Sequence, residues 1–284
     1  MRHLDLAPFQ RVLATLGLLA MTQGCWAQSP SSATAAAPPL TVHAAGSLRA
    51  VMGSLAQAFQ LAHPGGSTPR LVLGASGLLR DRLAAGEPSQ VFASANMAHP
   101  ESLVKDGKAN RVDAFARNAL CALAAPDFSL QGRTLAQRLL DDSVRVATST
   151  PRADPSGDYA FEMFERIEAT GSGPAGSAQA LKAKALQLTG GPQSPPPPSD
   201  RNVYGALMAE GRADVFITYC TNAAQAQREV RALQVLDIPD AINVSARYGI
   251  TRILPVTDSA NAFVDFVLSP AGQRILGEHG FKAP

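Results

Sequence analysis

The sequence has almost no excess of charge of either sign. Its 284 residues contain 25 Lys and Arg against 23 Asp and Glu, a formal net charge of +2 at pH 7. It also lacks a basic cluster with interleaved aromatic residues, the pattern that follows a phosphate backbone. Nucleic acid is therefore not an expected partner. The length allows either two lobes or one large α/β unit, and 46% hydrophobic residues is typical of a globular protein.

The usual arrangements of metal-binding and nucleophilic residues are missing too. Four of the five histidines, His43, His63, His99 and His279, form no pair at metal-ligand spacing. The turn at 74–77, Gly-Ala-Ser-Gly, is not the G-x-S-x-G of a nucleophile elbow, and no histidine follows a serine and an acid in a convincing order. We therefore expect no catalytic centre and no resident cofactor or metal. Ester hydrolysis that is lost on Ser76→Ala would support the alternative, an enzyme.

No apolar run near the N-terminus is long enough to span a bilayer. The run at 12–21 follows Arg2 and Arg11 and precedes a small-x-small sequence, Cys-Trp-Ala, at 25–27. These features predict a secretion signal peptide over residues 1–27.

Residues 28–39, rich in Ser, Ala and Pro, are predicted to be a disordered lead-in because they have little to bury. Lipoprotein anchoring at Cys25 is the weaker alternative, since Thr-Gln-Gly at 22–24 lacks the usual leucine of a lipobox. A soluble exported chain is expected.

Cysteine is scarce, with three residues in the whole sequence. Removal of the signal peptide leaves Cys121 and Cys220, an even number in an oxidising compartment. A disulfide between them and two buried free thiols are both compatible with the sequence, because Cys also packs as a small apolar residue. Sequence alone does not give the geometry that a bridge requires.

Short apolar runs alternate with helical patterns along most of the chain. The runs predict strands at 40–45, 70–73, 90–95, 120–125, 144–148, 214–218, 233–238 and 247–254. Alternation of strands and helices favours an α/β fold with a mostly parallel sheet flanked by helices. No repeat of fixed period is present.

Several predicted strands lead into a helix through a turn of small residues. Ser47 follows the first strand and precedes helically spaced apolar residues, which predicts an N-cap. Ser76 and Ser156 occupy similar turns, Val203 lies in the first turn of a further helix, and Tyr219 ends a strand.

Ligands in open α/β sheets bind beyond the carboxyl ends of the strands, where these turns gather. Helix starts offer unpaired N–H groups and a partial positive charge, so this arrangement favours an anion. No Lys, Arg or His is expected among the five residues. Neutral donors suit a fully deprotonated oxyanion, whereas a protonated phosphate would also need an acceptor such as a carboxylate.

The proline-rich segment 190–199 cannot form a helix and is predicted to be extended polyproline. Its interpretation stays open between a lid or docking surface beside the site and a solvated connector. The preceding residues 178–188 are compatible with a short helix. If the chain were an interaction protein that works through this segment, deletion of 191–198 would abolish partner binding and leave oxyanion binding intact.

Seven motifs in order resemble the periplasmic molybdate-binding proteins of ABC import systems, a type II periplasmic binding protein family. Together they span nearly all of the chain after the predicted signal peptide. They are Ala-Ala-Gly-Ser-Leu at 44–48, Gly-Ala-Ser-Gly-Leu at 74–78, Gly-Glu-Pro-Ser-Gln-Val-Phe-Ala-Ser-Ala at 86–95, Pro-Ser-Gly-Asp-Tyr-Ala at 155–160, Val-Tyr-Gly-Ala-Leu at 203–207, Asp-Val-Phe-Ile-Thr-Tyr at 214–219, and the ending at 263–276.

The resemblance implies two hinged lobes with a ligand cleft between them, 40–117 with 240–284 as the first and 118–239 as the second. It also implies a periplasmic monomer that delivers molybdate or tungstate to an ABC transporter permease, with molybdenum bound only as the oxyanion. The ligand contacts implied are hydroxyl and backbone N–H groups of Ser47 and Ser76, the backbone N–H groups of Ser156 and Val203, and the phenol of Tyr219.

The sequence departs from this family's pattern in four places. Gly46 and Ser156 replace the usual alanines, Asn96 replaces a common aspartate, the turn before Ser156 is compressed, and the proline-rich segment is long. The hydroxyl of Ser156 is an additional possible donor. A different oxyanion or a small organic acid is the alternative ligand, although the expected lack of an arginine clamp argues against carboxylates.

Overall fold

The computed structural model describes residues 40–64, 68–198 and 200–284. The predicted signal peptide, the lead-in at 28–39 and the possible lipid anchor at Cys25 lie outside the described residues. None of the helices within the described ranges has the length and hydrophobicity that crossing a membrane would require.

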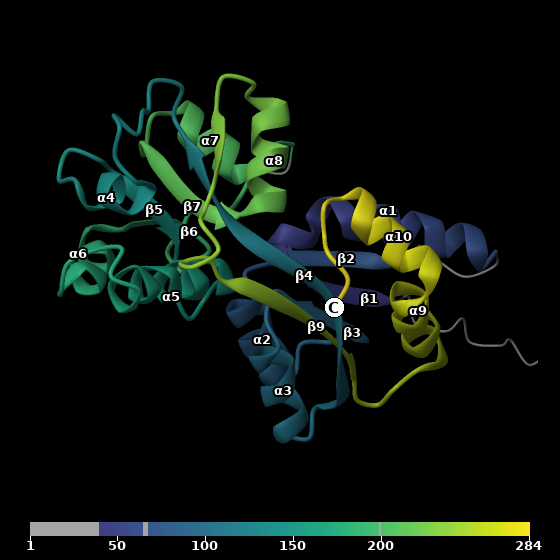
Figure 1. Ribbon diagram of the computed structural model, residues 1–284. Helices are drawn as coiled ribbons and strands as arrows, with labels where there is room; N and C mark the ends of the chain where they lie inside the picture. Colours follow the sequence, from purple (N-terminus) through teal and green to yellow (C-terminus); the bar gives the residue numbers. More distant parts are fainter. Residues whose placement is uncertain (1–39, 65–67, 199) are drawn as a thin grey trace, which may run out of the picture. The chain divides into compact units, whose positions relative to one another are not determined.

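Nine strands of the described chain form one hydrogen-bonded sheet (Figure 1). They are β1 (Thr41–Ala45), β2 (Arg70–Gly74), β3 (Val91–Ser94), β4 (Ala109–Ala124), β5 (Val146–Ser149), β6 (Leu186–Thr189), β7 (Val215–Tyr219), β8 (Gln234–Asp237) and β9 (Ser245–Ile253). Their order is β2-β1-β3-β9-β4-β7-β5-β6, and β8 also pairs with β4.

The helices are interleaved with these strands along the chain. They are the 3-10 helix η1 (Gly46–Leu48) and the α-helices α1 (Arg49–Ala62), α2 (Ser76–Ala84), α3 (Ala98–Lys105), α4 (Leu135–Leu140), α5 (Pro155–Ala169), α6 (Ser177–Lys184), α7 (Val203–Ala209), α8 (Cys220–Glu229), α9 (Asp258–Leu268) and α10 (Pro270–Glu278). The fold is therefore mixed α/β, with a multi-stranded sheet flanked by helices.

The long strand β4 joins two halves of the sheet. Up to Ala119 it pairs with β9, and from Leu120 onward it pairs with β7 and β8. We call β1, β2, β3 and β9 the first half and β5, β6, β7 and β8 the second half. Pairings within the set β1, β2, β3 and within the set β5, β6, β7 are parallel, whereas every described pairing of β4 or β9 is antiparallel. The sheet as a whole is thus mixed, and parallel pairs predominate inside each half, as expected. The division into two lobes at 117/118 and 239/240 stays a prediction.

Both faces of the sheet are covered by helices. In β3, Val91 and Ala93 pack in the cluster with α1, α9 and α10, while Phe92 between them packs with Leu79 of α2 and Leu103 of α3. Successive side chains of a strand point to opposite faces, so this alternation fixes one helix layer on each side. Figure 1 shows α1, α9 and α10 together on one side of the first half and α2 and α3 on the other.

Each of the eight predicted strands overlaps an observed one, and one observed strand was missed. The helix expected over 178–188 ends at Lys184, and Leu186–Thr189 becomes β6, which pairs with β5. Pairing with a neighbouring strand overrides the weak local preference of these residues. Cys121 and Cys220 form a disulfide, with an S–S distance of 2.01 Å, that ties β4 to the start of α8.

Candidate functional site

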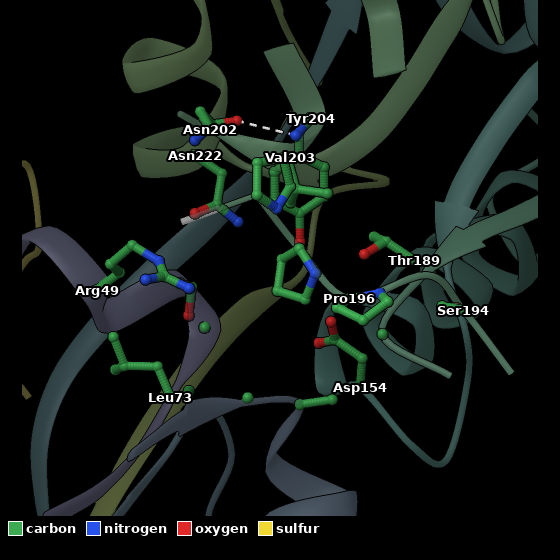
Figure 2. A pocket seen from close by; sticks show the side chains of 18 of the residues that line it. Arg49, Leu73, Asp154, Thr189, Ser194, Pro196, Asn202, Val203, Tyr204 and Asn222 are labelled. Atoms are coloured by element: carbon green, nitrogen blue, oxygen red, sulfur yellow. Dashed lines mark hydrogen bonds between the residues drawn. The ribbon is translucent and has the colours of Figure 1, made fainter. Parts of the chain in front are cut away.

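A cavity of about 410 Å³ opens where turns from both halves of the sheet meet. Figure 2 shows its walls. The first half contributes residues around Ser47, Arg49 and Ser76, and the second half contributes Asp154 and the starts of α7 and α8. The proline-rich segment also lines it, through Pro192, Ser194, Pro195, Pro196, Pro197 and Pro198.

Ser47 lines this cavity but does not cap a helix. The chain leaves β1 at Ala45 in an extended conformation and tightens at once into η1, so Ser47 is the middle residue of a 3-10 turn. Neither η1 nor α1 has a side-chain N-cap. The predicted capping role is wrong, and the Ser47 hydroxyl instead lies 3.1 Å from the hydroxyl of Tyr248.

Ser76 lines the same cavity as the first residue of α2. Its Oγ accepts a hydrogen bond of 3.1 Å from the N–H of Ala95, so the serine's own O–H is left to donate. The residue before it, Ala75, is the N-cap and has no side chain that could satisfy the helix start. The turn therefore presents donors rather than acceptors.

Val203 is the third predicted residue at the cavity, as the first residue of α7. The Asn202 side chain caps this helix and accepts from the N–H groups of Tyr204 and Gly205, at 3.0 and 3.1 Å. No described acceptor takes the N–H of Val203. Val203 thus lines the cavity with an amide that no described acceptor takes, and its contact with a ligand stays a prediction.

Ser156 and Tyr219 do not line the cavity. Ser156 is fully buried, its N–H donates to Asp154 Oδ1 at 3.0 Å, and its Oγ has no hydrogen-bond partner among the described residues. Tyr219 is 1% exposed, and its hydroxyl donates to the Ala95 carbonyl over 3.4 Å. Burial raises the pKa of the Tyr219 phenol well above 10. Two of the five predicted contacts are thus absent from the cavity lining.

The start of α2 is in direct contact with the loop that precedes α5. The N–H of Gly77 in α2 donates to the carbonyl of Ala153, at 2.8 Å. Gly77 permits this approach because a Cβ there would lie 2.4 Å from the Arg152 carbonyl oxygen. A protein carbonyl therefore takes one of the α2 donors that an anion could otherwise use.

Arg49 is a cavity residue that sequence reasoning missed. It is the first residue of α1, two positions after Ser47, and Figure 2 shows its side chain reaching into the cavity. Within the described chain its guanidinium has no hydrogen-bond or ion-pair partner. The expectation that no cation stands among the donors is wrong. Its position in the first helical turn beside Ser47 was the available signal.

Asp154 is the second missed residue, and it brings a carboxylate to the cavity. It is the N-cap of α5 and is followed by Pro155, a common arrangement at the start of a helix. Burial raises its pKa to about 6, against the lowering effect of the Ser156 N–H and the Ser149 hydroxyl, while Asp158 adds to the rise. The cap sequence Asp-Pro predicts this position, although not its exposure to a ligand.

The proline-rich segment forms a wall of the cavity rather than a connector remote from it. Gly190 has a positive φ of 78°, and a Cβ there would lie 2.6 Å from Asp154 Oδ2, so only glycine lets the chain turn past this carboxylate. The prolines that follow have no N–H to offer a ligand. This wall contributes shape and apolar surface.

Groups of three or more His, Cys, Asp or Glu side chains that could hold a metal ion do not occur within the described ranges. The side chains that line the cavity include hydroxyls, amides, the guanidiniums of Arg49 and Arg201, and the carboxylates of Asp154, Asp200 and Glu229. Such a set binds a small anion or a polar organic ligand through hydrogen bonds and charge.

Comparison with known proteins assigns the chain to a family. Residues 40–282 match the model of the bacterial extracellular solute-binding proteins. The chain belongs to this family. It is 35% identical over 248 residues to an uncharacterized protein of Pasteurella multocida, covering 85% of this chain and 98% of that protein. It is 27% identical over 273 residues to a molybdate-binding protein of Mycobacterium bovis, covering 94% of each.

Solved structures share the fold. The periplasmic molybdate-binding protein of Azotobacter vinelandii superposes with a TM-score of 0.64 at 19% identity, over 86% of this chain and 99% of that one. The periplasmic binding protein AfuA of Actinobacillus pleuropneumoniae, with bound fructose-6-phosphate, gives 0.65 at 14% identity, over 85% and 82%. Solute-binding proteins with different ligands thus share this fold.

Proposed function

We propose that this protein is the solute-binding component of an ABC importer that captures molybdate or tungstate in the periplasm and delivers it to a membrane permease. The observation that carries the proposal is the meeting of Ser47, Ser76 and Val203, from three separate turns, at one cavity. The relationship to a molybdate-binding protein over nearly the whole chain supports it.

The chemistry of these groups fits a tetrahedral dianion. The hydroxyls of Ser47 and Ser76 and the N–H of Val203 are donors, and the Arg49 guanidinium adds a positive charge. A hydrogen bond to a charged group contributes roughly 1.5–3 kcal/mol. Sulfate is smaller and would leave some donors unpaired, so size sets the selectivity. Hydrogen bonds hardly distinguish molybdate from tungstate, since the two have nearly the same size and charge.

In this proposal the protein acts as a monomer, without a resident cofactor or metal, and molybdenum enters only as part of its oxyanion. Solute binding is the function of the family, and an enzymatic activity forms no part of the proposal. The two hinged lobes expected from the resemblance would close on the ligand and present the closed form to the permease.

A thermal-shift experiment tests the proposal. A ligand that binds only the folded state stabilises it by about 4 kcal/mol at a thousand times its Kd. Molybdate or tungstate should therefore raise the Tm clearly, and sulfate should do little. Ser47→Ala or Ser76→Ala should weaken binding about tenfold or more per lost donor. Ser129→Ala, an exposed serine away from the cavity, is the matched control. The absence of a shift with any tetrahedral oxyanion would contradict the proposal.

An organic anion is the second candidate, and Arg49 and the cavity volume favour it. A volume of about 410 Å³ falls within the range of roughly 300–1,000 Å³ that sites for small organic ligands occupy. A guanidinium without a protein partner can bind a phosphate or carboxylate group in a bidentate fork.

Fructose-6-phosphate and glycerol phosphate, added to the same thermal-shift panel, separate the two candidates. Binding of an organic phosphate that Arg49→Gln abolishes, together with no response to molybdate, would establish the second candidate. A response to molybdate alone would remove it.

A further inference from the structure

The candidate cavity contains a partly buried acid, Asp154, as well as the donors for an anion. Asp154 and Arg49 lie on separate walls in Figure 2, and no ion pair joins them in the part of the chain that the structure describes. The arginine is therefore available to a ligand's negative charge. The carboxylate, by contrast, would lie in the same small space as that charge.

The structure holds Asp154 in place from two sides. Its Oδ1 accepts the N–H of Ser156 at the start of α5, and the backbone at Gly190 packs against its other oxygen, Oδ2. The carboxylate cannot swing away without losing its helix cap. It also occupies the amide that the family resemblance assigns to the ligand.

Two like charges in a cavity of low dielectric repel each other strongly. A hydrogen shared between their oxygens replaces this repulsion with a hydrogen bond. An ionised carboxylate only accepts hydrogen bonds, whereas a protonated one can donate. The hydrogen can come from the ligand, as with hydrogen phosphate, or from the solvent by protonation of Asp154, as with molybdate. Both routes lead to the same contact.

We propose that Asp154 is a specificity-determining residue that shares one hydrogen with an oxygen of the bound anion. The cavity consequently favours anions that carry this hydrogen. When a bound anion carries none, Asp154 takes up a proton from the solvent. This inference rests on the proposed function, anion capture in this cavity, and adds its proton dependence and its preference among anions.

Several other charged and titratable groups lie near Asp154. Asp158 on its own helix is half-buried and accepts from the N–H of Arg152, and burial raises its pKa too. The phenols that face Asp154 have pKa values raised further above 10 by burial. The groups concerned are Asp158 and Tyr159 of α5, Arg152 of the preceding loop, Tyr204 of α7, Tyr219 of β7, Tyr248 of β9, and Arg49, Asp200, Arg201 and Glu229 along the cavity.

The sign of the pH dependence follows from the raised pKa of about 6. Below that pH the carboxyl already holds its hydrogen, so a bare dianion binds without proton uptake. Above it, each bound molybdate must bring one proton from solvent, and Kd rises about tenfold per pH unit. Hydrogen phosphate keeps its own hydrogen across this range, so its Kd should change little between pH 7 and 8.5.

Titration calorimetry on the whole mature protein tests this inference. Molybdate, sulfate and inorganic phosphate are titrated from pH 5.5 to 8.5, in two buffers of different ionisation enthalpy so that the protons taken up can be counted. We expect uptake of nearly one proton per molybdate at pH 8 and almost none with phosphate.

Asp154→Asn keeps a preferred N-cap residue at this position and removes the acid. We expect a molybdate Kd that no longer depends on pH, and a preference for molybdate over phosphate at pH 8 that increases at least tenfold. Asp106→Asn removes the same charge from an exposed position outside the cavity lining and should follow the parent protein.

The outcomes separate the inference from the proposed function. Anion binding with no proton uptake, and with the same pH dependence and preference in Asp154→Asn, would overturn the inference and leave the function standing. If neither the parent protein nor the variant gives a heat of binding with any of these anions, the inference and the proposed function are both overturned. If Asp154→Asn does not fold, the proton count in the parent protein decides.

Discussion

On both sides of the candidate cavity a strand leads through a turn into a helix, but the N-cap residue of that helix differs between the sides. On the first half of the sheet, α2 begins after Ala75, which has no side-chain acceptor. On the second half, α5 and α7 begin after Asp154 and Asn202, whose side chains accept the first N–H groups of their own helices. The residue type at the N-cap thus decides whether a helix start is open to a ligand.

The difference also places a carboxylate on the second side of the cavity. The first side contributes Ser47, Ser76 and the unpaired Arg49, whereas the second side contributes the Asp154 carboxylate and a wall of prolines. A ligand that lies between them meets the Arg49 guanidinium and serine hydroxyls on one side, and the Asp154 carboxylate together with the Val203 N–H on the other. An anion that also carries a hydrogen matches both sides.

The largest expected effect is the loss of stability when the disulfide of the second half is removed. The disulfide Cys121–Cys220 closes a loop of 99 residues, and loss of a bridge typically costs about 2–5 kcal/mol. Replacement of both cysteines by Ala should therefore lower the free energy of unfolding by this amount. Chemical denaturation of the oxidised protein and of the double variant measures it.

The reduced parent protein controls for the substitution itself. It should unfold at a denaturant concentration close to that of the double variant. Equal stability of all three forms would mean that β4 and α8 hold the second half together without the bridge.

Two glycines, one inside the second half and one at the contact between the halves, allow the two halves to be tested separately. A Cβ on Gly157 would lie 2.4 Å from the Ser149 carbonyl oxygen within the second half. A Cβ on Gly77 would lie 2.4 Å from the Arg152 carbonyl oxygen, across the two halves. Either alanine forces backbone to move, at a cost of about 1–3 kcal/mol. We expect Gly157→Ala to lower the Tm more, because it distorts the start of α5 itself.

Gly77→Ala should instead loosen the contact between the halves and increase protease cleavage near residues 152–153. The control is Gly53→Ala at an exposed position of α1, where no atom lies within 4 Å of the added Cβ. That change should stabilise the helix by about 0.5–1 kcal/mol. If both Gly77→Ala and Gly157→Ala raise the Tm as Gly53→Ala does, the close approaches described here do not exist in solution.

Much of the fold can be predicted from the sequence because it depends on local pattern. The eight predicted strands were recognisable as short apolar runs, and the overlap with the observed strands confirms them. Strand β6 and the antiparallel pairings of β4 and β9 could not be predicted in this way. They depend on which distant segment each strand pairs with, and the local hydrophobic pattern does not specify the pairing partner.

The site was predictable to a smaller degree. Ser47, Ser76 and Val203 do meet at one cavity, since each follows or begins an element with a clear pattern. Ser156 and Tyr219 do not line it: Asp154 takes the Ser156 amide, and the buried Tyr219 hydroxyl donates to the Ala95 carbonyl. A capping analysis of Asp154 would have anticipated the first fact. The side-chain direction of Arg49 follows from packing and was not available.

The smallest expected effect concerns one backbone donor on the second side. Val203 is the first residue of α7, where proline is well tolerated, and Asn202 before it has the extended conformation that precedes proline. Val203→Pro therefore deletes the N–H and should change the Tm little. If that N–H donates to the anion, the loss of one hydrogen bond, about 1.4 kcal/mol, should raise the molybdate Kd about tenfold. Val203→Ala shortens the side chain, keeps the amide, and should bind as the parent does. Equal weakening in both variants would assign the effect to the side chain, and no weakening in either would confine the donors for the anion to the first side of the cavity.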